Sequence, residues 1–273
     1  MNYATITSLN FYPVKSCRGI ALKEAHIQSS GIEGDRRWMI VNESGRFLTQ
    51  RELPRMALIT PAVAAGGLSL VAPGMPALTM PQSLDGPSIP VTIFAHRCTA
   101  IDAGPGPAEW LTQFLERTVR LVRFDPRLVR PIDPRLWTGD IEAHVTFPDA
   151  FPLLLIAQKS LDDLNSRLQD PLPMNRFRPN VVLEGLGPYE EDRIHELSAG
   201  GLKLRMAMAC TRCKITTTDQ LTGESSTAEP LATLRGYRWN SALHGVMFGH
   251  YAVVHGAVGT RLRPGQQLEI AWK

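Results

Sequence analysis

Short apolar and β-branched stretches, each ended by glycine or proline, limit most strongly how this chain can fold. The 273 residues include 22 Gly and 21 Pro. Residues 4–9 alternate between apolar and polar side chains, which is typical of a strand with one buried face because successive strand side chains point to opposite sides. Further strands are predicted at residues 37–41, 46–49, 68–71, 91–94, 153–156, 180–183, 202–205, 214–218, 251–254 and 268–270.

Few helices interrupt these strands. Residues 107–117 place four large apolar side chains on one helical face, and a second helix is expected to begin at Ser160, whose hydroxyl can cap its first amides. Strands that do not alternate with helices favour a mainly β fold built of barrels over a doubly wound parallel sheet. A soft domain boundary is expected near Asp125, which divides the chain into 1–125 and 126–273 with strands that can be shared.

Composition excludes several classes of protein. With 44% hydrophobic and 20% charged residues the chain is typical of a soluble globular protein. A net charge of +3 without a basic block argues against nucleic acid as a partner. Prolines break the longest uncharged stretch, 56–84, so no membrane span is expected, and residues 1–6 do not resemble a signal peptide. We therefore expect a cytoplasmic protein.

The sharpest chemical feature is the pair Cys210-x-x-Cys213. Taken alone it fits a zinc half-site, a redox dithiol, a single metal thiolate beside a bystander, or a structural pair. Zinc would need further ligands, yet Cys17 and Cys98 stand singly, and a redox dithiol would begin a helix where residues 214–218 predict a strand. Neighbouring Arg212 and Lys214 would favour a thiolate that could bind a soft metal.

Three further segments carry groups that suit an anionic ligand. YPVKSCRG at 12–19 offers cations and a hydroxyl in one loop, and NRFRPN at 175–180 places Arg178 and Asn180 on the same side of a strand entry. GDRRW at 34–38 adds Asp35 and Arg36. Each segment alone is equally explained by strand-end turns with solvated charges.

Together these segments resemble the MOSC family, named for the C-terminal domain of molybdenum cofactor sulfurase, and in particular its amidoxime-reducing branch with an N-terminal MOSC β-barrel domain. The resemblance covers nearly the whole chain. It rests on six ordered motifs: YPVKSCRG at 12–19, GDRRW at 34–38, FPDAFPLLLI at 147–156, NRFRPN at 175–180, ACTRCKITT at 209–217 and EPLATLRGYR at 229–238.

The resemblance implies an N-terminal β-barrel-like domain followed by a MOSC β-barrel domain, and a molybdenum cofactor of the molybdopterin type. Cys213, second in the C-x-x-C segment, matches the family's metal thiolate, which leaves Cys210 as a supporting thiol. Ala150 and Phe151 match a loop whose backbone touches the cofactor. The complete set that matches cofactor contacts is Lys15, Ser16, Arg36, Ala150, Phe151, Arg178, Asn180, Thr211, Arg212 and Tyr251.

The resemblance also implies an oxidoreductase that removes oxygen from small N-hydroxylated compounds to give amines or amidines. Asp219 is a candidate for passing protons to the departing oxygen, and a turn residue is the alternative. Some relatives carry a ferredoxin-like domain, but no cysteines for an iron–sulfur cluster follow here. Electrons are therefore expected from a separate ferredoxin, flavoprotein or cytochrome b5-like reductase.

Two rival interpretations use the same residues differently. In one, the chain is a cofactor carrier or a sulfur-handling domain, and Cys213 accepts sulfur as a persulfide. In the other, the barrel is a protein-interaction module that needs neither molybdenum nor sulfur chemistry. The substrate pocket is expected among loops such as residues 127–141.

Overall fold

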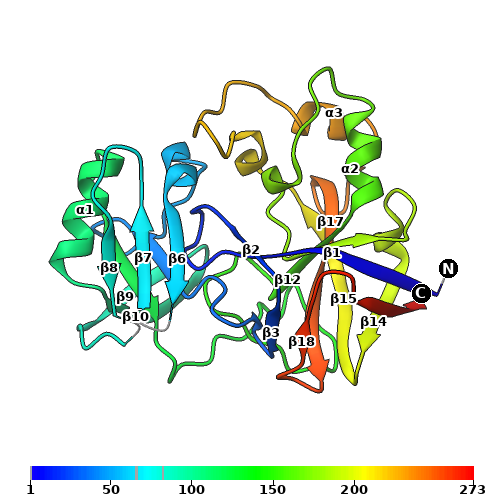
Figure 1. Cartoon of the computed structure of the whole chain (residues 1–273), viewed down its shortest axis with the longest axis horizontal. Coiled ribbons are helices and arrows are strands. Elements are labelled where there is room, and N and C mark those ends of the chain that lie inside the picture. Colours follow the sequence, from blue (N-terminus) through cyan, green and yellow to red (C-terminus); the bar gives the residue numbers. More distant parts are fainter. Residues whose placement is uncertain (1, 65–66, 82) are drawn as a thin grey trace.

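Seven strands close into a barrel in the computed structural model, which describes residues 2–64, 67–81 and 83–273 (Figure 1). Around the barrel the order is β12, β13, β1, β19, β14, β15 and β17, and β17 pairs back with β12. All neighbours are antiparallel except the parallel pair β12 and β13. The strands span Leu153–Ala157 (β12), Val181–Glu184 (β13), Tyr3–Phe11 (β1), Gln267–Trp272 (β19), Ile194–Ala199 (β14), Leu202–Thr211 (β15) and Gly245–Gly256 (β17).

Alternating side chains fill the barrel interior. In β1 the buried side chains of Ala4 and Ile6 alternate with partly exposed ones, and a bulge between Ile6 and Ser8 shifts the pattern before Leu9. These residues pack with Leu183, Leu197 and other inward-facing side chains in one apolar cluster. The N-terminal strand therefore belongs to the same core as strands near residue 270, although hundreds of residues separate them along the chain.

The other half of the molecule holds two smaller sheets and a helix (Figure 1). The first sheet has the order β5, β11, β10 and β9, and the second has the order β6, β7 and β8. Trp110, Leu111, Phe114 and Leu115 of α1 are buried, which confirms the predicted apolar face. The elements are Trp38–Val41 (β5), Thr60–Ala64 (β6), Gly67–Val71 (β7), Leu78–Met80 (β8), Ser88–Ile93 (β9), His96–Asp102 (β10), Pro105–Leu115 (α1) and Arg120–Phe124 (β11).

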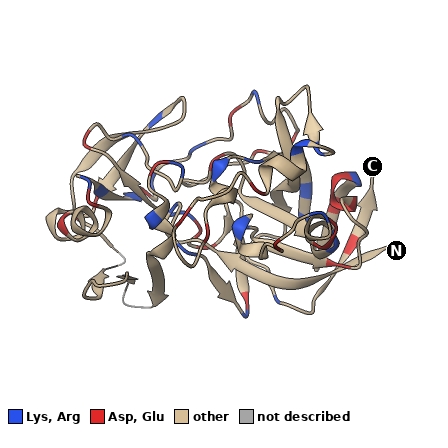
Figure 2. Ribbon diagram, turned by 90° about the horizontal axis from the view of Figure 1, so that it is seen from above, with Lys and Arg blue, Asp and Glu red and all other residues tan. Residues whose placement is uncertain are grey.

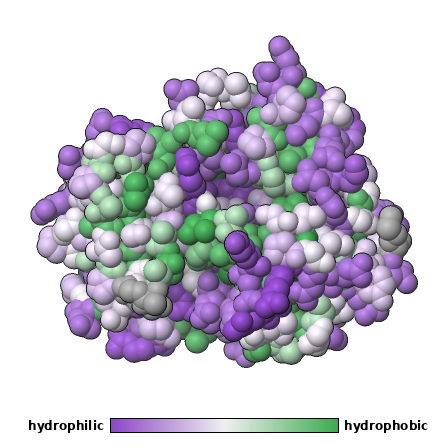
Figure 3. Space-filling view, in the orientation of Figure 1, coloured by the Kyte–Doolittle hydropathy of each residue, from purple (hydrophilic) through white to green (hydrophobic). Residues whose placement is uncertain are grey.

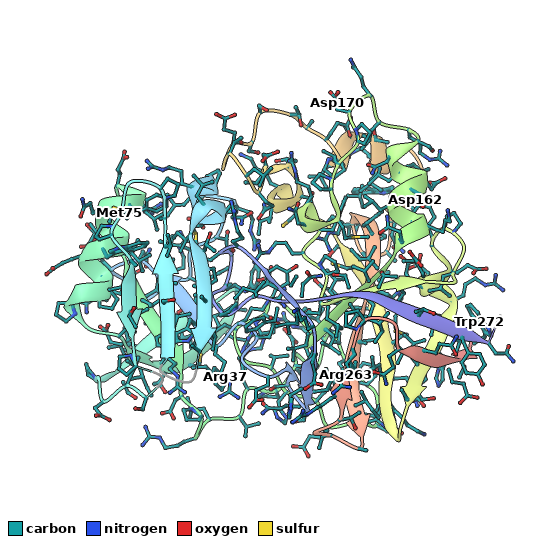
Figure 4. All side chains as sticks on the ribbon, viewed as in Figure 1. Arg37, Met75, Asp162, Asp170, Arg263 and Trp272 are labelled. Carbon is teal, nitrogen blue, oxygen red and sulfur yellow. The ribbon has the colours of Figure 1, made fainter. Side chains whose placement is uncertain are left out.

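Shorter elements connect and cover these sheets. Figure 4 shows Asp162 of α2 and Trp272 of β19 in the barrel half, and Met75 at the opposite side of the molecule. No helix in the described ranges is long and apolar enough to span a membrane. The remaining elements are Ile20–Leu22 (β2), Ala25–Gln28 (β3), Gly31–Ile32 (β4), Pro54–Leu58 (η1), Gln158–Asn165 (α2), Met174–Arg176 (η2), Glu190–Arg193 (η3), Lys214–Thr217 (η4), Leu231–Arg235 (α3), Trp239–Asn240 (β16) and Arg261–Leu262 (β18).

A long connection between β11 and β12 turns back on itself near the barrel mouth. Pro131 and His144 form an isolated antiparallel bridge, and the Ile132 amide donates to the Ala143 carbonyl at 3.1 Å. Trp137, inside this ribbon, donates to the Ile141 carbonyl at 2.9 Å and meets Phe151 edge to face. The ribbon is thus anchored to the segment that leads into β12.

Three local predictions were wrong. Residues 214–218 were expected to form a strand, but 214–217 form the 3₁₀ helix η4, in which the Thr216 and Thr217 hydroxyls donate to backbone carbonyls three residues earlier. Ser160 does not cap α2, because it lies inside the helix and donates to buried Glu191. Residues 46–49 make only isolated bridges, one with Val41 and one with Thr92, although the Leu48 amide donates to the Ile40 carbonyl as the predicted hairpin requires.

Candidate functional site

Cys213 stands just beyond the end of β15, where that strand leaves the barrel. The pairing of β15 with β17 shifts register between Met206 and Ala209 and again before Thr211, so the strand end bends away from a regular ladder. Cys213 then precedes η4, and its carbonyl accepts from the Thr216 amide at 3.1 Å. The Cys213 side chain is a partly exposed free thiol.

The two cysteines of the C-x-x-C segment lie in different environments. Cys210 is buried, and its sulfur accepts a hydrogen bond from Arg212 Nη1 at 3.0 Å. Burial raises the pKa of the Cys210 thiol, although the nearby Arg212 guanidinium opposes this. Within the described residues no three His, Cys, Asp or Glu side chains gather as a zinc site would require. The segment therefore presents one accessible thiol, that of Cys213.

A cavity of about 110 Å³ lies beside Cys213 and collects most of the predicted site residues. Several segments far apart in the sequence contribute to it: loop 12–19, the 34–38 turn, the entry to β13, the end of β15 and the middle of β17. Ten predicted residues line it: Lys15, Ser16, Arg36, Phe151, Arg178, Asn180, Thr211, Arg212, Cys213 and Tyr251.

Positive charge dominates this cavity. Lys15, Arg36, Arg178 and Arg212 all line it, and Asp149 is the carboxylate among its described lining residues. Burial lowers the pKa of Lys15 to about 8 against the attraction of Asp149, and burial lowers the pKa of Arg178 to about 10. Desolvated cations of this kind favour an anionic ligand. Seen from above, several basic residues lie near the middle of the molecule, where the two halves meet (Figure 2).

Tyr12 fixes two of these guanidinium groups. The Arg36 and Arg178 guanidinium carbons lie 4.2 and 4.3 Å from the Tyr12 ring centroid, close enough for cation–π contacts. The Tyr12 hydroxyl donates to the Pro179 carbonyl at 3.0 Å. Arg36 also forms an ion pair with buried Asp35 and donates to Asn180 at 3.1 Å. Arg36 and Asn180 are therefore held in place by neighbouring side chains.

Backbone conformation sets the same site apart. Ser16, Arg36 and Arg178 all have positive φ, at 65°, 45° and 57°. Non-glycine residues seldom adopt this left-handed conformation, and its strain is concentrated at functional sites. Arg178 therefore does not reach the cavity by strand alternation as the sequence suggested. The left-handed turn before β13 directs its side chain there.

Asp149 connects this cavity to a second and larger one. It forms an ion pair with Lys15 and another with Arg51 at 3.3 Å. Burial alone would raise the pKa of Asp149, but Lys15 and Arg51 hold it below its usual range. The second cavity, of about 570 Å³, shares Asp149, Thr211, Cys213 and Tyr251 with the first. The space-filling view in the orientation of Figure 1 shows a hollow near the middle of the molecule, with hydrophilic residues inside it (Figure 3).

Three predicted site residues, Ala150, Phe151 and Asp219, differ in their positions relative to the two cavities. Phe151 stacks on Tyr251 with ring centroids 5.2 Å apart, whereas Ala150 lines the second cavity and not the first. Asp219 lines neither cavity. Its carboxylate bonds Arg176 at 2.8 Å and accepts from the Leu221 amide at 2.7 Å, so it serves as a turn residue.

The donor set suits a molybdopterin-type group. The guanidinium nitrogen Nε of Arg212 is buried without a hydrogen-bond partner, although Nη2 of the same residue donates to the Phe177 carbonyl at 2.6 Å. Among the described residues Arg178 has no carboxylate partner within hydrogen-bond range, and its bond to Gln220 measures 3.5 Å. Phosphate oxygens would satisfy such donors, and a single thiolate suits a soft metal.

Comparison with known proteins agrees with this geometry. The MOSC N-terminal β-barrel domain model matches residues 3–118, and the MOSC domain model matches residues 142–269. Mitochondrial amidoxime-reducing component 1 of Mus musculus is 36% identical over 90% of this chain and 77% of its own length. The chain belongs to the MOSC family. In Homo sapiens, component 1 is 35% identical over 92% of this chain and 78% of its length, and component 2 is 36% identical over 86% and 72%.

Two residues of this MOSC site were not predicted from the sequence. Asp149 lies in the FPDAFP motif beside Ala150, and Tyr12 begins the YPVKSCRG motif, yet neither was assigned a role. A signal was present for both, because an acid between two predicted contact segments and an aromatic before a basic loop suit cation binding. Asp149 contacts Lys15, and Tyr12 contacts Arg178, but each pair is far apart in the sequence, so the sequence alone did not predict these contacts.

Proposed function

We propose that this MOSC protein is a molybdenum-cofactor-dependent oxidoreductase that reduces N-hydroxylated compounds to amines or amidines. The observation that carries the proposal is the accessible Cys213 thiol at the junction of a cationic cavity and a larger second cavity. Relatives named amidoxime-reducing components support the reaction class. Reduction of an N–OH group consumes two electrons and two protons and releases water.

Each part of the first cavity has a distinct task in this proposal. The Cys213 thiolate would complete the coordination of molybdenum, and the metal would supply the two-electron chemistry. Arg178, Arg36 and Lys15 would hold the phosphate of the cofactor through charge-assisted hydrogen bonds. Arg212 would orient the pterin end with its free Nε. Tyr251, stacked on Phe151, would keep water from the side of the thiolate.

The electrons would come from a separate protein, such as a ferredoxin, a flavoprotein or a cytochrome b5-like reductase. We place the reaction in the cytoplasm. Proton delivery is not assigned to Asp219, because its carboxylate holds Arg176 and the 219–222 turn.

Metal content provides the test. Protein purified from a host that makes the cofactor should carry about one molybdenum per chain. The variant Cys213→Ser should lose most of it, whereas the matched control Cys98→Ser should keep it, since Cys98 lines neither cavity. Reduction of an amidoxime with an artificial electron donor should follow the metal content.

Two outcomes would favour the rival interpretations. Metal-free protein that carries a labile sulfane sulfur on Cys213 would indicate a sulfur-handling domain. Protein that binds molybdenum cofactor through Cys213 but reduces no N-hydroxylated compound would indicate a carrier. Either result would overturn the proposed enzyme.

A further inference from the structure

The second cavity is bounded by parts of both halves of the molecule. Phe94 comes from the turn between β9 and β10, His96 begins β10, and Arg51 comes from the segment before η1. Ile132 and Leu136 come from the folded ribbon between β11 and β12, and the floor is formed by the end of β15 and by β17. With a volume of about 570 Å³ it can enclose a small organic molecule.

Phe94 is the most unusual residue of this cavity. It occupies the first position of the two-residue turn between the paired residues Ile93 and His96, with φ of 53°. That position favours glycine or asparagine, because a bulky side chain is strained there. The Phe94 side chain is also 49% exposed. A strained and exposed aromatic is costly to stability, and it offers an apolar surface that a ligand can cover.

The Phe94 ring is held in place rather than loose. Its centroid lies 4.8 Å from that of Phe47, and the Arg51 guanidinium carbon lies 5.3 Å from it. Leu136, which is 41% exposed, lines the same cavity from the ribbon. Two large apolar side chains from different halves of the chain thus line the cavity and remain open to solvent.

The charges around this cavity are largely paired with one another. Asp149 bonds Arg51 at 3.3 Å, and Asp133 bonds Arg135 at 2.6 Å, so neither carboxylate of the described lining is free to bind a cation. Arg130 adds a third guanidinium, which donates to the Thr146 carbonyl at 2.6 Å. The lining therefore disfavours cationic ligands and leaves apolar surface for an uncharged one.

We infer that this cavity selects uncharged N-hydroxylated compounds with an apolar, flat body, which packs against Phe94 and Leu136 while the N–OH group faces Cys213. The inference rests on the proposed function. It also explains product release, because hydroxylation lowers the basicity of an amidine. The substrate enters neutral, and the product, once protonated, is repelled by the arginine-rich lining.

Two probes with the same reactive group separate this inference from the proposed function. Benzamidoxime carries an aromatic body, and acetamidoxime carries only a methyl group. In Phe94→Asn the left-handed turn is preserved, because asparagine adopts it readily, and only the aromatic wall is lost. We expect the KM for benzamidoxime to rise about three- to tenfold and the KM for acetamidoxime to stay unchanged, with similar kcat.

Binding measured without turnover provides a second readout. Isothermal titration calorimetry of oxidised protein should show the same three- to tenfold loss of benzamidoxime affinity in Phe94→Asn. Unhydroxylated benzamidine should bind the wild type more weakly than benzamidoxime does. The matched control is Val129→Asn, which removes a 69% exposed apolar side chain near the ribbon without touching the cavity. It should leave both measurements unchanged.

The outcomes are distinguishable. If wild-type protein reduces neither amidoxime, the proposed function fails. If it reduces both, but Phe94→Asn changes neither KM nor affinity for benzamidoxime, the inference fails while the function stands. Tighter binding of benzamidine than of benzamidoxime would also overturn the inference. Should Phe94→Asn lower the thermal midpoint, Leu136→Ser tests the same wall from the other half of the chain.

Discussion

At the scale of single residues, burial decides what each ionisable group can do. Cys210 and Cys213 are only three positions apart, yet one is a buried thiol held by Arg212 and the other is an accessible thiol at a cavity. The same contrast separates Asp149, whose carboxylate stays charged between Lys15 and Arg51, from Glu191, which is buried with no cation of the described residues within ion-pair distance. Because Glu191 has only neutral hydrogen-bond donors, its pKa is raised toward neutral pH, whereas the pKa of Asp149 is lowered.

Glu191 gives a prediction about stability. Burial raises its pKa from the ordinary 4.5 to about 7, although bonds from Ser160 and Ala157 oppose the shift. Between these two pH values the folded protein holds a proton that the unfolded chain releases, so this stabilisation is complete below 4.5 and lost as pH rises through 7. The variant Glu191→Gln should remove that slope.

Chemical denaturation at pH 4.5 and pH 8 measures the effect. The unfolding free energy of the wild type should fall by on the order of 3 kcal/mol more than that of Glu191→Gln across this interval. Exposed Glu269→Gln makes the same change of charge and should follow the wild type. Equal pH dependence of the wild type and Glu191→Gln would show that Glu191 is already ionised at low pH.

The resemblance of six sequence motifs to the MOSC family was enough to predict most residues that line the first cavity. Ten of the residues that match family contacts do line it, because the motifs that carry them fold back onto one barrel mouth. Contacts made across the fold were not predictable. Arg176 bonds the Asp219 carboxylate, and Glu191 accepts from the Ser160 hydroxyl in place of the predicted cap. Neither partner is near in sequence.

At the scale of elements, local propensity misleads where side chains bond their own backbone. Residues 214–217 are rich in β-branched side chains and predicted a strand, yet Thr216 and Thr217 turn their hydroxyls onto nearby carbonyls and stabilise η4. The alternating strands were predicted well because burial on one face imposes a period of two. The register shifts between β15 and β17 leave no such periodic signal.

Gly249, in β17, tests how tightly the barrel closes. Its φ is +76°, and a Cβ there would lie 2.9 Å from the Leu155 carbonyl oxygen and 2.6 Å from Ile156 Cγ1, both on β12. Gly249→Ala should therefore destabilise the fold by about 2–5 kcal/mol, through strain and overpacking together. If the proposed cofactor is bound, its retention should also fall, because Tyr251 lies two residues further along.

Gly259 provides the matched control for this substitution. It has a similar φ of +89°, but nothing lies within 4 Å of an added Cβ. Gly259→Ala should cost only the conformational strain, about 1–2 kcal/mol. Urea denaturation of both variants measures the difference, and equal losses would mean that β17 can move away from β12 without penalty.

At the scale of the whole molecule, the N-terminal segment forms part of the barrel. Strand β1 lies between β13 and β19 in the barrel, and Ala25, Ile27 and Ile32 belong to the barrel core. The division into 1–125 and 126–273 remains a prediction about domains. What the fold shows is that the N-terminal segment contributes to the core of the C-terminal half.

Expression of residues 126–273 alone provides the corresponding test. Without β1 the barrel would be open, and β13 and β19 would each present an unpaired edge, which favours aggregation. We expect this fragment to be insoluble or to lack a cooperative unfolding transition. Co-expression with residues 1–36, which include β1 to β4, should restore soluble protein. A monomeric fragment that unfolds cooperatively on its own would contradict this reading of the barrel.

The position of β1 also affects how the protein can be made in a cell. During synthesis β1 leaves the ribosome long before its partner β19, at residues 267–272. At typical elongation rates the interval between the synthesis of β1 and that of β19 is on the order of tens of seconds. The edge of β1 that pairs with β19 must stay open for that time, although β2 and β13 can already pair with β1, so the barrel closes only once β19 has left the ribosome. The proposed cofactor would find a complete site only then.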